Sequence, residues 1–251
     1  MIEVENRGVV SVLRMARGKG NALNLALLAA LAEALDALER GPARSGVITG
    51  QGNVFGAGVD LPELLAGGEG YIRRFLPSMV DVFQRLATFP KPLVAAVNGH
   101  AIAGGAIIML ACDLRLLAAG SARIGLSEIQ VGVLFPSWAL EIARYTTPRE
   151  HFSSLICTGR TWLPDEALAR GLVDELVAPE GLLDRACTVA GELAELAPAT
   201  FETTKLAVRR PMIEAAERLR AGDAAIVDNW CSAETLANIA AFAERNIKRR
   251  A

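Results

Sequence analysis

Short apolar blocks alternate along the chain with longer stretches in which hydrophobic residues recur at helical spacing. The blocks are rich in β-branched residues and bounded by glycine, proline or polar residues, so they predict buried strands at 47–49, 93–97, 114–117 and 122–124. Leucines from Leu27 to Leu38 fall on one helical face, with Asn24 placed to cap that helix and Gly41-Pro42 to end it. This alternation predicts an α/β fold with a mainly parallel sheet and right-handed crossovers.

The two ends of the chain follow other patterns. Near the N-terminus, Asn6-Arg7-Gly8 separates two short apolar runs and predicts a β-hairpin. Beyond Pro136 the pattern is mostly helical, with one short strand predicted at 172–177. After about Pro198 the helical periodicity continues with more charge, which predicts a helical arm packed on the core or on another subunit. We therefore divide the chain into a core, residues 1–197, and a helical region, residues 198–251.

Glycines break the pattern at three places. Gly67-Gly68 and Gly70 predict a mobile break between a short helix at 61–65 and a longer helix at 71–87. The strand at 93–97 leads through Ala103-Gly104-Gly105 into an apolar run, which predicts a glycine-rich turn into a helix.

The strand at 47–49 is followed by a similar turn. It leads through Gly56 and Gly58 to a helix that begins at Asp60. The first N–H groups of a helix have no intrahelical partner, and the positive end of the helix dipole lies behind them. We expect each of these two turns to offer one N–H group to a single carbonyl oxygen.

Charge and cysteine content exclude several classes of protein. The chain has 26 basic and 28 acidic residues, and this balance argues against general affinity for nucleic acid. The four cysteines are scattered, so neither a disulfide framework nor a zinc site is expected. There is no signal pattern and no apolar run of about 18 residues, so we predict a cytoplasmic protein with no membrane partner.

Glu128 is the residue with the best prospect of acid–base chemistry. It lies within a glycine-punctuated apolar run from Ile124 to Val133, where burial would raise its pKa towards that of a usable base. An exposed glutamate between two buried neighbours is the alternative. The dinucleotide-binding motif is incomplete and no P-loop motif occurs. A nucleophile-elbow motif is also incomplete, because its last position is Ile129 instead of glycine. His100, next to a glycine turn, is expected to be packed in the fold or to lie at the rim of a pocket, rather than to be catalytic.

Three segments resemble the motifs of one enzyme family. Phe55-Gly56-Ala57-Gly58-Val59-Asp60-Leu61 resembles the F-x-A-G-x-D-L motif of the crotonase (enoyl-CoA hydratase/isomerase) superfamily. The segment from Pro92 to Asp113 resembles its second motif, and Gly171-Leu172-Val173-Asp174 a later one. The resemblance implies a crotonase-like ββα-spiral core with a C-terminal helical trimerisation region, as a homotrimer or a dimer of trimers. It also implies an acyl-CoA thioester substrate, with CoA entering as part of that substrate and no separate cofactor.

The same resemblance assigns roles by position. The backbone N–H groups of Val59 and Gly104 would hold the thioester oxygen. Hydratases of the family use two glutamates; the first position here is Ile107 and the second is Glu128. A lone carboxylate suits proton transfer between two carbons. The segment Ile124-Gly125-Leu126-x-Glu128-x-Gln130-x-Gly132, followed by Pro136 and Trp138, also resembles the Δ3,Δ2-enoyl-CoA isomerase branch of the family. Two further readings stay open: another thioester-enolate reaction such as hydration, or a non-catalytic acyl-CoA-binding trimer.

The remaining assignments concern the ends of the substrate. By the same resemblance, Arg17 and Lys19 would meet the CoA phosphates and Ala57 would lie near the adenine. Phe135 and Trp138 would add an apolar wall near Glu128.

Overall fold

The computed structural model describes the backbone of residues 1–248 and the side chains of residues 1–245. The larger of its two sheets has six strands in the order β1-β2-β3-β5-β7-β10. Their bounds are β1 Ile2–Arg7, β2 Val10–Met15, β3 Ser45–Gly50, β5 Leu93–Val97, β7 Leu114–Ala118 and β10 Glu175–Val177. The β1–β2 pair is the predicted antiparallel hairpin, and every later pairing in this sheet is parallel.

A smaller sheet lies beside the glycine turns. It has the order β4-β6-β8-β9, with β4 Val54–Gly56, β6 His100–Ile102, β8 Ile124–Gly125 and β9 Thr161–Trp162. The first three strands run parallel and β9 is antiparallel to β8. Strands of two or three residues give too short a pattern to be recognised in a sequence, and of these four only β8 had been partly expected, at 122–124.

The helices follow the strands in the alternation that the sequence predicts. They are α1 Leu25–Arg40, α2 Leu61–Ala87, α3 Gly104–Ala111, α4 Glu128–Val131, α5 Ser137–Thr146, α6 Arg149–Thr158, α7 Pro164–Ala169, α8 Leu182–Ala194, α9 Pro198–Arg220, α10 Asp223–Cys231 and α11 Ala233–Lys248. The side chain of Asn24 caps α1 by accepting a hydrogen bond from the Leu27 N–H group at 2.8 Å. The side chain of Asp60 caps α2 in the same way, through the Glu63 N–H group at 3.1 Å.

The break predicted at Gly67-Gly68 and Gly70 is present: within α2, two helical segments meet at a kink at Gly68, whose φ of 59° and ψ of −158° are not helical. One prediction about these elements was wrong in its bounds. The strand predicted at 172–177 is shorter, since β10 begins only at Glu175. The chain leaves α7 through Gly171 at φ 66° and reaches the sheet at Asp174, whose N–H group donates to Arg115 O at 2.8 Å.

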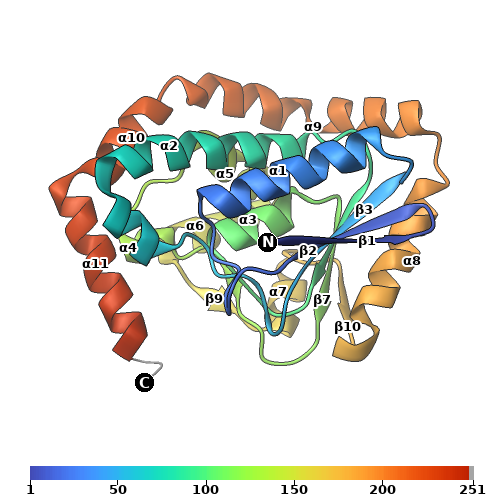
Figure 1. The fold of residues 1–251 in the computed structure, drawn as a ribbon, viewed down its shortest axis with the longest axis horizontal. Helices are drawn as coiled ribbons and strands as arrows, with labels where there is room; N and C mark the ends of the chain where they lie inside the picture. Colours follow the sequence, from blue (N-terminus) through green and yellow to red (C-terminus); the bar gives the residue numbers. More distant parts are fainter. Residues whose placement is uncertain (249–251) are drawn as a thin grey trace.

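Both faces of the large sheet are covered, which is why its central strands are apolar throughout. Successive residues point to opposite faces. Ile48 packs into the core below α1, α2 and α3, whereas Val47 packs against α8. Figure 1 shows α1 and α2 lying side by side on one face and α8 on the other.

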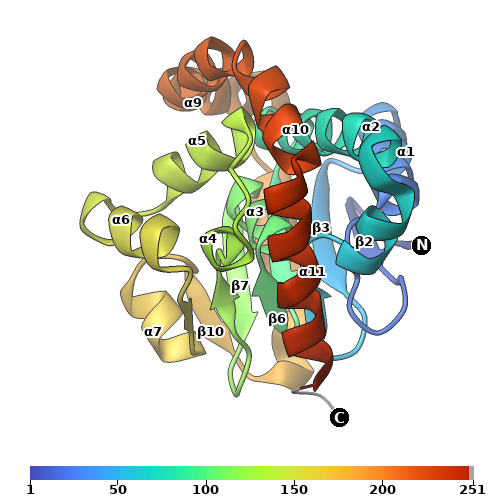
Figure 2. The same ribbon diagram turned by 90° about the vertical axis from the view of Figure 1, so that its left-hand side faces the viewer.

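The C-terminal helices continue the layer on one side. Figure 2 shows α9 above α5, and α11 running down past α4. Buried cations attach α9 to the core: Lys205 Nζ is 2.8 Å from Asp113 Oδ2, and Arg209 Nη2 is 2.9 Å from Asp113 Oδ1. Arg209 also donates to the carbonyl oxygens of Ala87 and Ala111. The region 198–248 is thus helical, as predicted; its separation as a domain and its role in trimer formation stay predictions.

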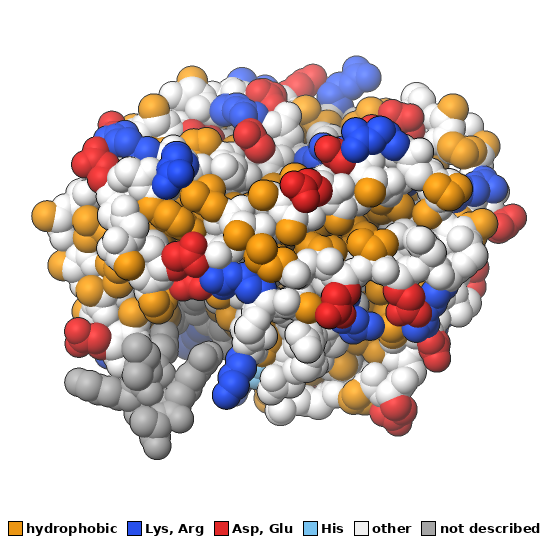
Figure 3. Space-filling model, viewed as in Figure 1, with side chains coloured by type: hydrophobic (Ala, Val, Ile, Leu, Met, Phe, Trp, Pro, Cys, Tyr) orange, Lys and Arg blue, Asp and Glu red, His pale blue; other side chains and the backbone are white. Residues whose placement is uncertain are grey.

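The surface carries charges of both signs. On the face drawn in Figure 3, Lys and Arg side chains stand beside Asp and Glu side chains, and apolar side chains lie between them. Arg85, for example, pairs with Asp36 and Glu39. Within residues 1–248, no helix is both long and apolar enough to cross a membrane.

Candidate active site

The two glycine turns meet backbone to backbone. Strand β4 pairs with β6, and Gly56 lies against Gly105 at the start of α3. A Cβ atom on Gly105 would be 2.2 Å from Gly56 O and 2.7 Å from Gly56 Cα, a separation that real Cβ atoms do not adopt. Glycine is therefore required at position 105 for the two turns to approach this closely.

The amide of Val59 is directed away from its neighbouring segment. Leu23 N donates to Gly58 O at 2.7 Å, and Asp60 N donates to Leu23 O at 2.9 Å. This bridge uses the residues on either side of Val59, so the N–H group of Val59 itself faces the opposite way. Within the described chain, that N–H group donates no hydrogen bond.

The amide of Gly104 is the second unused donor. Gly104 is the first residue of α3, where N–H groups lack intrahelical acceptors, and it has no acceptor elsewhere in the described residues. Ala103 before it is held at φ 52°, a left-handed conformation that costs a non-glycine residue about 1–3 kcal/mol. Val59 and Gly104 line the same pocket, so the two glycine turns place both residues at one cavity. That their N–H groups meet at a single oxygen stays a prediction.

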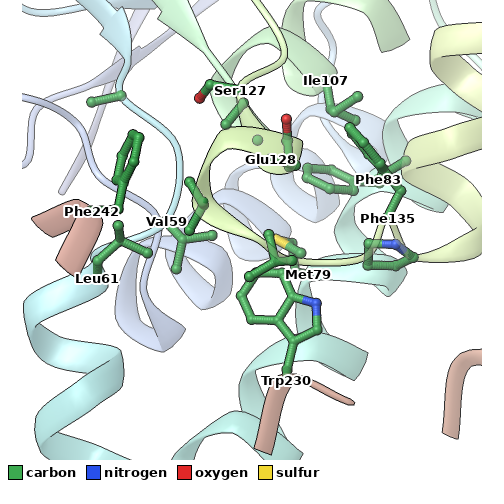
Figure 4. A pocket seen from close by; sticks show the side chains of 17 residues that line it. Val59, Leu61, Met79, Phe83, Ile107, Ser127, Glu128, Phe135, Trp230 and Phe242 are labelled. Carbon is green, nitrogen blue, oxygen red and sulfur yellow. The ribbon is translucent and has the colours of Figure 1, made fainter. Parts of the chain in front are cut away.

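The pocket is a largely apolar cavity of about 60 Å³. Figure 4 shows its labelled side chains, which come from α2, α3, α4, α10 and α11 and the loops between them. Of the residues singled out in the sequence, it is lined by Ala57, Val59, Leu61, Gly104, Ile107, Glu128 and Phe135. Trp138 does not line it: this side chain is fully buried in the core, on the inner side of α5.

Glu128 places a carboxyl group in this apolar pocket. It is the first residue of the four-residue helix α4, which ends at Gly132 in a left-handed conformation. The residue as a whole is half-buried, but its Oε2 atom is out of contact with solvent and has no hydrogen-bond partner among the described residues. Burial raises the pKa of the Glu128 carboxyl from 4.5 to about 8, because the charged form is poorly solvated there. The alternative of an exposed glutamate is wrong.

Ile107 faces the same pocket. It lies three residues after Gly104 on α3, so both are on one side of the helix. Among the residues that line the pocket, all of which the structure describes, Glu128 is the only acidic one. The pocket thus combines one carboxyl group of raised pKa, two unused N–H groups and apolar walls.

A wider groove of about 610 Å³ opens beside the pocket. Ala57, Ser127 and Phe242 line both, so the groove leads into the pocket. Its other lining residues include the polar or charged Lys19, Asn53, His100, Gln130 and Arg160, together with the apolar Val54 and Ile102. His100 is therefore at a rim, as predicted, and its Nδ1 accepts a hydrogen bond from Arg123 N at 3.0 Å.

Arg17 does not line this groove. Its guanidinium is 2.8 Å from Asp60 Oδ2 and 2.9 Å from Glu63 Oε2, and it also donates to Ala22 O. Through these contacts the charged Arg17 side chain attaches its loop to the first turn of α2. Lys19 is exposed and lines the groove, so of the two predicted phosphate contacts only Lys19 is in a position to meet a ligand there.

Several lining residues were missed in the sequence. Met79 and Phe83 lie on the buried stripe of α2, and helical spacing in a sequence cannot distinguish core residues from those of a pocket wall. Trp230 and Phe242 reach the pocket from α10 and α11, more than a hundred residues after Glu128, and no local pattern marks them.

Both the sequence and the fold are similar to those of known proteins. Residues 5–249 match the family described as enoyl-CoA hydratase/isomerase. The short-chain-enoyl-CoA hydratase of Clostridium acetobutylicum is 32% identical over 83% of this chain and 81% of its own.

Among solved structures, the human mitochondrial delta3-delta2-enoyl-CoA isomerase superimposes with a TM-score of 0.92, at 27% identity, covering 100% of this chain and 99% of that one. A Mycobacterium tuberculosis protein is called an enoyl-CoA isomerase in one structure and a probable enoyl-CoA hydratase in another. These two structures give TM-scores of 0.83 and 0.84 at 33% and 34% identity, covering 89% of this chain in both cases and 97% and 94% of the other chain.

Proposed function

This chain belongs to the enoyl-CoA hydratase/isomerase family, and from that premise we propose that it converts a 3-enoyl-CoA into the conjugated 2-enoyl-CoA. It is a crotonase-fold enzyme of that family, whose members carry both hydratase and isomerase names. The observation that favours isomerisation is the pairing of Glu128 with Ile107 in one apolar pocket. A single carboxyl group can carry a proton between two carbons, whereas adding water calls for groups that orient and deprotonate it.

In the proposed reaction, the N–H groups of Val59 and Gly104 donate hydrogen bonds to the thioester oxygen. The Glu128 carboxylate removes a proton from C2, and the electron pair moves towards that oxygen to give a dienolate. The protonated Glu128 then returns the proton at C4, which leaves the double bond between C2 and C3. Each N–H donor is expected to lower the barrier by about 3–4 kcal/mol, because fixed dipoles need no reorganisation as charge develops.

The groove supports a proposal for where the rest of the substrate binds. We propose that the CoA portion lies along it, with Lys19 near the phosphates and Ala57 near the adenine. Homotrimer formation, or a dimer of trimers, remains a prediction from the family resemblance, as does a cytoplasmic location.

A comparison of two substrates tests the reaction. We expect 3-enoyl-CoA to be converted with a kcat/KM at least about 100-fold above that for hydration of 2-enoyl-CoA. Hydration in this pocket would lack the rate contribution of a second acid–base group, because only one carboxylate is present. The first reaction raises ultraviolet absorbance by creating a conjugated thioester, and the second lowers it. Comparable rates for the two would favour hydration, the activity named for the Clostridium relative.

The pH dependence tests the role of Glu128 as base. We expect kcat/KM for isomerisation to rise with pH and level off above about 8, because only the ionised carboxylate removes the proton and burial raises its pKa to about 8. At pH 7 about a tenth of the enzyme would have Glu128 ionised, so kcat/KM on the plateau should be roughly tenfold higher than at pH 7. A midpoint near the ordinary glutamate value, measured between about pH 4 and pH 9, would contradict the burial argument.

A further inference from the structure

The pocket adjoins a second, largely apolar cavity. This second cleft, of about 260 Å³, is lined by Leu76, Pro77 and Val80 of α2, by Pro136, and by Arg220, Asp223, Ala224, Ile226 and Val227 in and before α10. Pro136 lines both the pocket and the cleft. We infer that Trp230 separates the two and thereby restricts this protein to short acyl chains; the inference rests on the proposed binding of acyl-CoA thioesters.

Helical spacing locates the boundary between the two cavities. On α2, Met79 and Phe83 line the pocket while Leu76 and Val80, on the neighbouring stripe, line the cleft. On α10, Trp230 lies one turn beyond Ile226 on the same face, yet it lines the pocket and Ile226 lines the cleft. The two cavities share Pro136 and are lined from neighbouring stripes of α2 and neighbouring turns of α10, so the boundary between them runs along these elements, and Trp230 is the large side chain on the pocket side of it.

The indole is held in one place. Trp230 is 2% exposed, and its Nε1 donates a hydrogen bond to Leu134 O at 3.0 Å. Figure 4 shows it beside Met79, with Glu128 at the other end of the pocket. An acyl chain that extends away from the reacting carbons near Glu128 would therefore meet this ring.

The cleft has walls suited to methylene groups. Its charged residues already have partners: Asp223 accepts hydrogen bonds from the Ser137 N–H and hydroxyl groups at 2.9 and 2.7 Å, and Arg220 is 2.7 Å from Asp81. The remaining lining is apolar. Removing the indole would join pocket and cleft into one longer apolar channel.

Binding of saturated acyl-CoA esters tests this without depending on turnover. By isothermal titration calorimetry, affinity of the wild-type protein should rise about fourfold per added methylene and stop rising once the chain reaches Trp230. We expect Trp230→Ala to bind decanoyl-CoA at least about tenfold more tightly than wild type, with butanoyl-CoA changed by less than about threefold. The probes are butanoyl-, hexanoyl-, decanoyl- and tetradecanoyl-CoA.

Two matched variants separate the barrier from the anchoring of α10. Trp230→Phe loses the hydrogen bond to Leu134 O but keeps a ring, so it should keep the wild-type chain-length limit. Val227→Trp, added to Trp230→Ala, should fill the cleft and cancel the gain for decanoyl-CoA.

Three outcomes overturn the inference. One is an unchanged chain-length profile in a folded Trp230→Ala protein. Another is an affinity of the wild-type protein that keeps rising with chain length up to tetradecanoyl-CoA, a measurement that needs no variant. The third is failure of Val227→Trp to cancel the gain. Absence of binding for every acyl-CoA would instead reject the proposed function, so the two failures are distinguishable.

Discussion

Replacing Glu128 by glutamine is expected to lower kcat for 3-enoyl-CoA isomerisation by about a thousandfold or more. The amide cannot accept the proton from C2, and general acid–base catalysis by one positioned group contributes about 10²–10⁴-fold to a rate. Glutamine has nearly the same size, so the cavity and the N–H groups of Val59 and Gly104 should be unaffected. Affinity for a saturated acyl-CoA should therefore change by less than about threefold.

The control for this variant removes a carboxylate outside the pocket. Glu150 is exposed on α6 and does not line the pocket, so Glu150→Gln should keep the wild-type kcat. Steady-state kinetics and calorimetric binding of hexanoyl-CoA give the two quantities for each protein. If Glu128→Gln retained wild-type turnover, the proposed proton transfer would be rejected; if it lost binding as well, the cause would be structural.

The same variant has a consequence for stability. The folded-state pKa of Glu128 is about 8 and its ordinary value is 4.5, so the folded state favours the protonated form. The stability from this difference is fully present below about pH 4.5 and is lost as pH rises through about 8. Glu128→Gln carries no such loss, so in urea unfolding it should become more stable than wild type as pH rises from 5 to 9, by a few kcal/mol. The carboxylate proposed as the base is thus held at a cost in stability.

Local chemistry made part of this site predictable. The caps at Asn24 and Asp60 and the turns around Gly58 and Gly104 depend on neighbouring residues and on backbone freedom, and the structure has them where the sequence predicts them. The raised pKa of Glu128 was also predictable, since an apolar run on both sides of a carboxylate implies poor solvation.

Other parts depend on tertiary contacts that no local pattern encodes. Arg17 has the charge expected of a phosphate contact, but Asp60 and Glu63 reach it only once the loop folds over α2. Trp138 and Trp230 are both buried tryptophans in helices, and only the packing of α10 against α2 decides that the second lines the pocket. The position of a residue in a helical stripe gives its burial but not the neighbour it meets.

Gly105→Ala is expected to reduce kcat/KM by about 100-fold or more, because it separates the two turns that carry the N–H donors. The new Cβ would lie 2.2 Å from Gly56 O and 2.5 Å from Gly56 C, and backbone atoms cannot rotate away as a side chain can. A shift of the order of 1 Å between the turns follows, and misplacement on that scale costs about 10²-fold in rate. Overpacking should also lower stability, by about 1–3 kcal/mol.

Two further glycine substitutions calibrate this effect. A Cβ on Gly56 would be 2.9 Å from Gly105 Cα, a milder overlap, so Gly56→Ala should lose less activity than Gly105→Ala. Gly191 lies within α8 with nothing within 4 Å of its added Cβ, so Gly191→Ala should keep wild-type activity and gain up to about 1 kcal/mol of stability. The loss of activity should therefore increase with the steric overlap of the added Cβ atom. Replacing a glycine without such overlap should not reduce activity. A folded Gly105→Ala protein with wild-type kcat/KM would show that the two amides need not converge on one oxygen, and the proposed stabilisation of the dienolate would have to be abandoned.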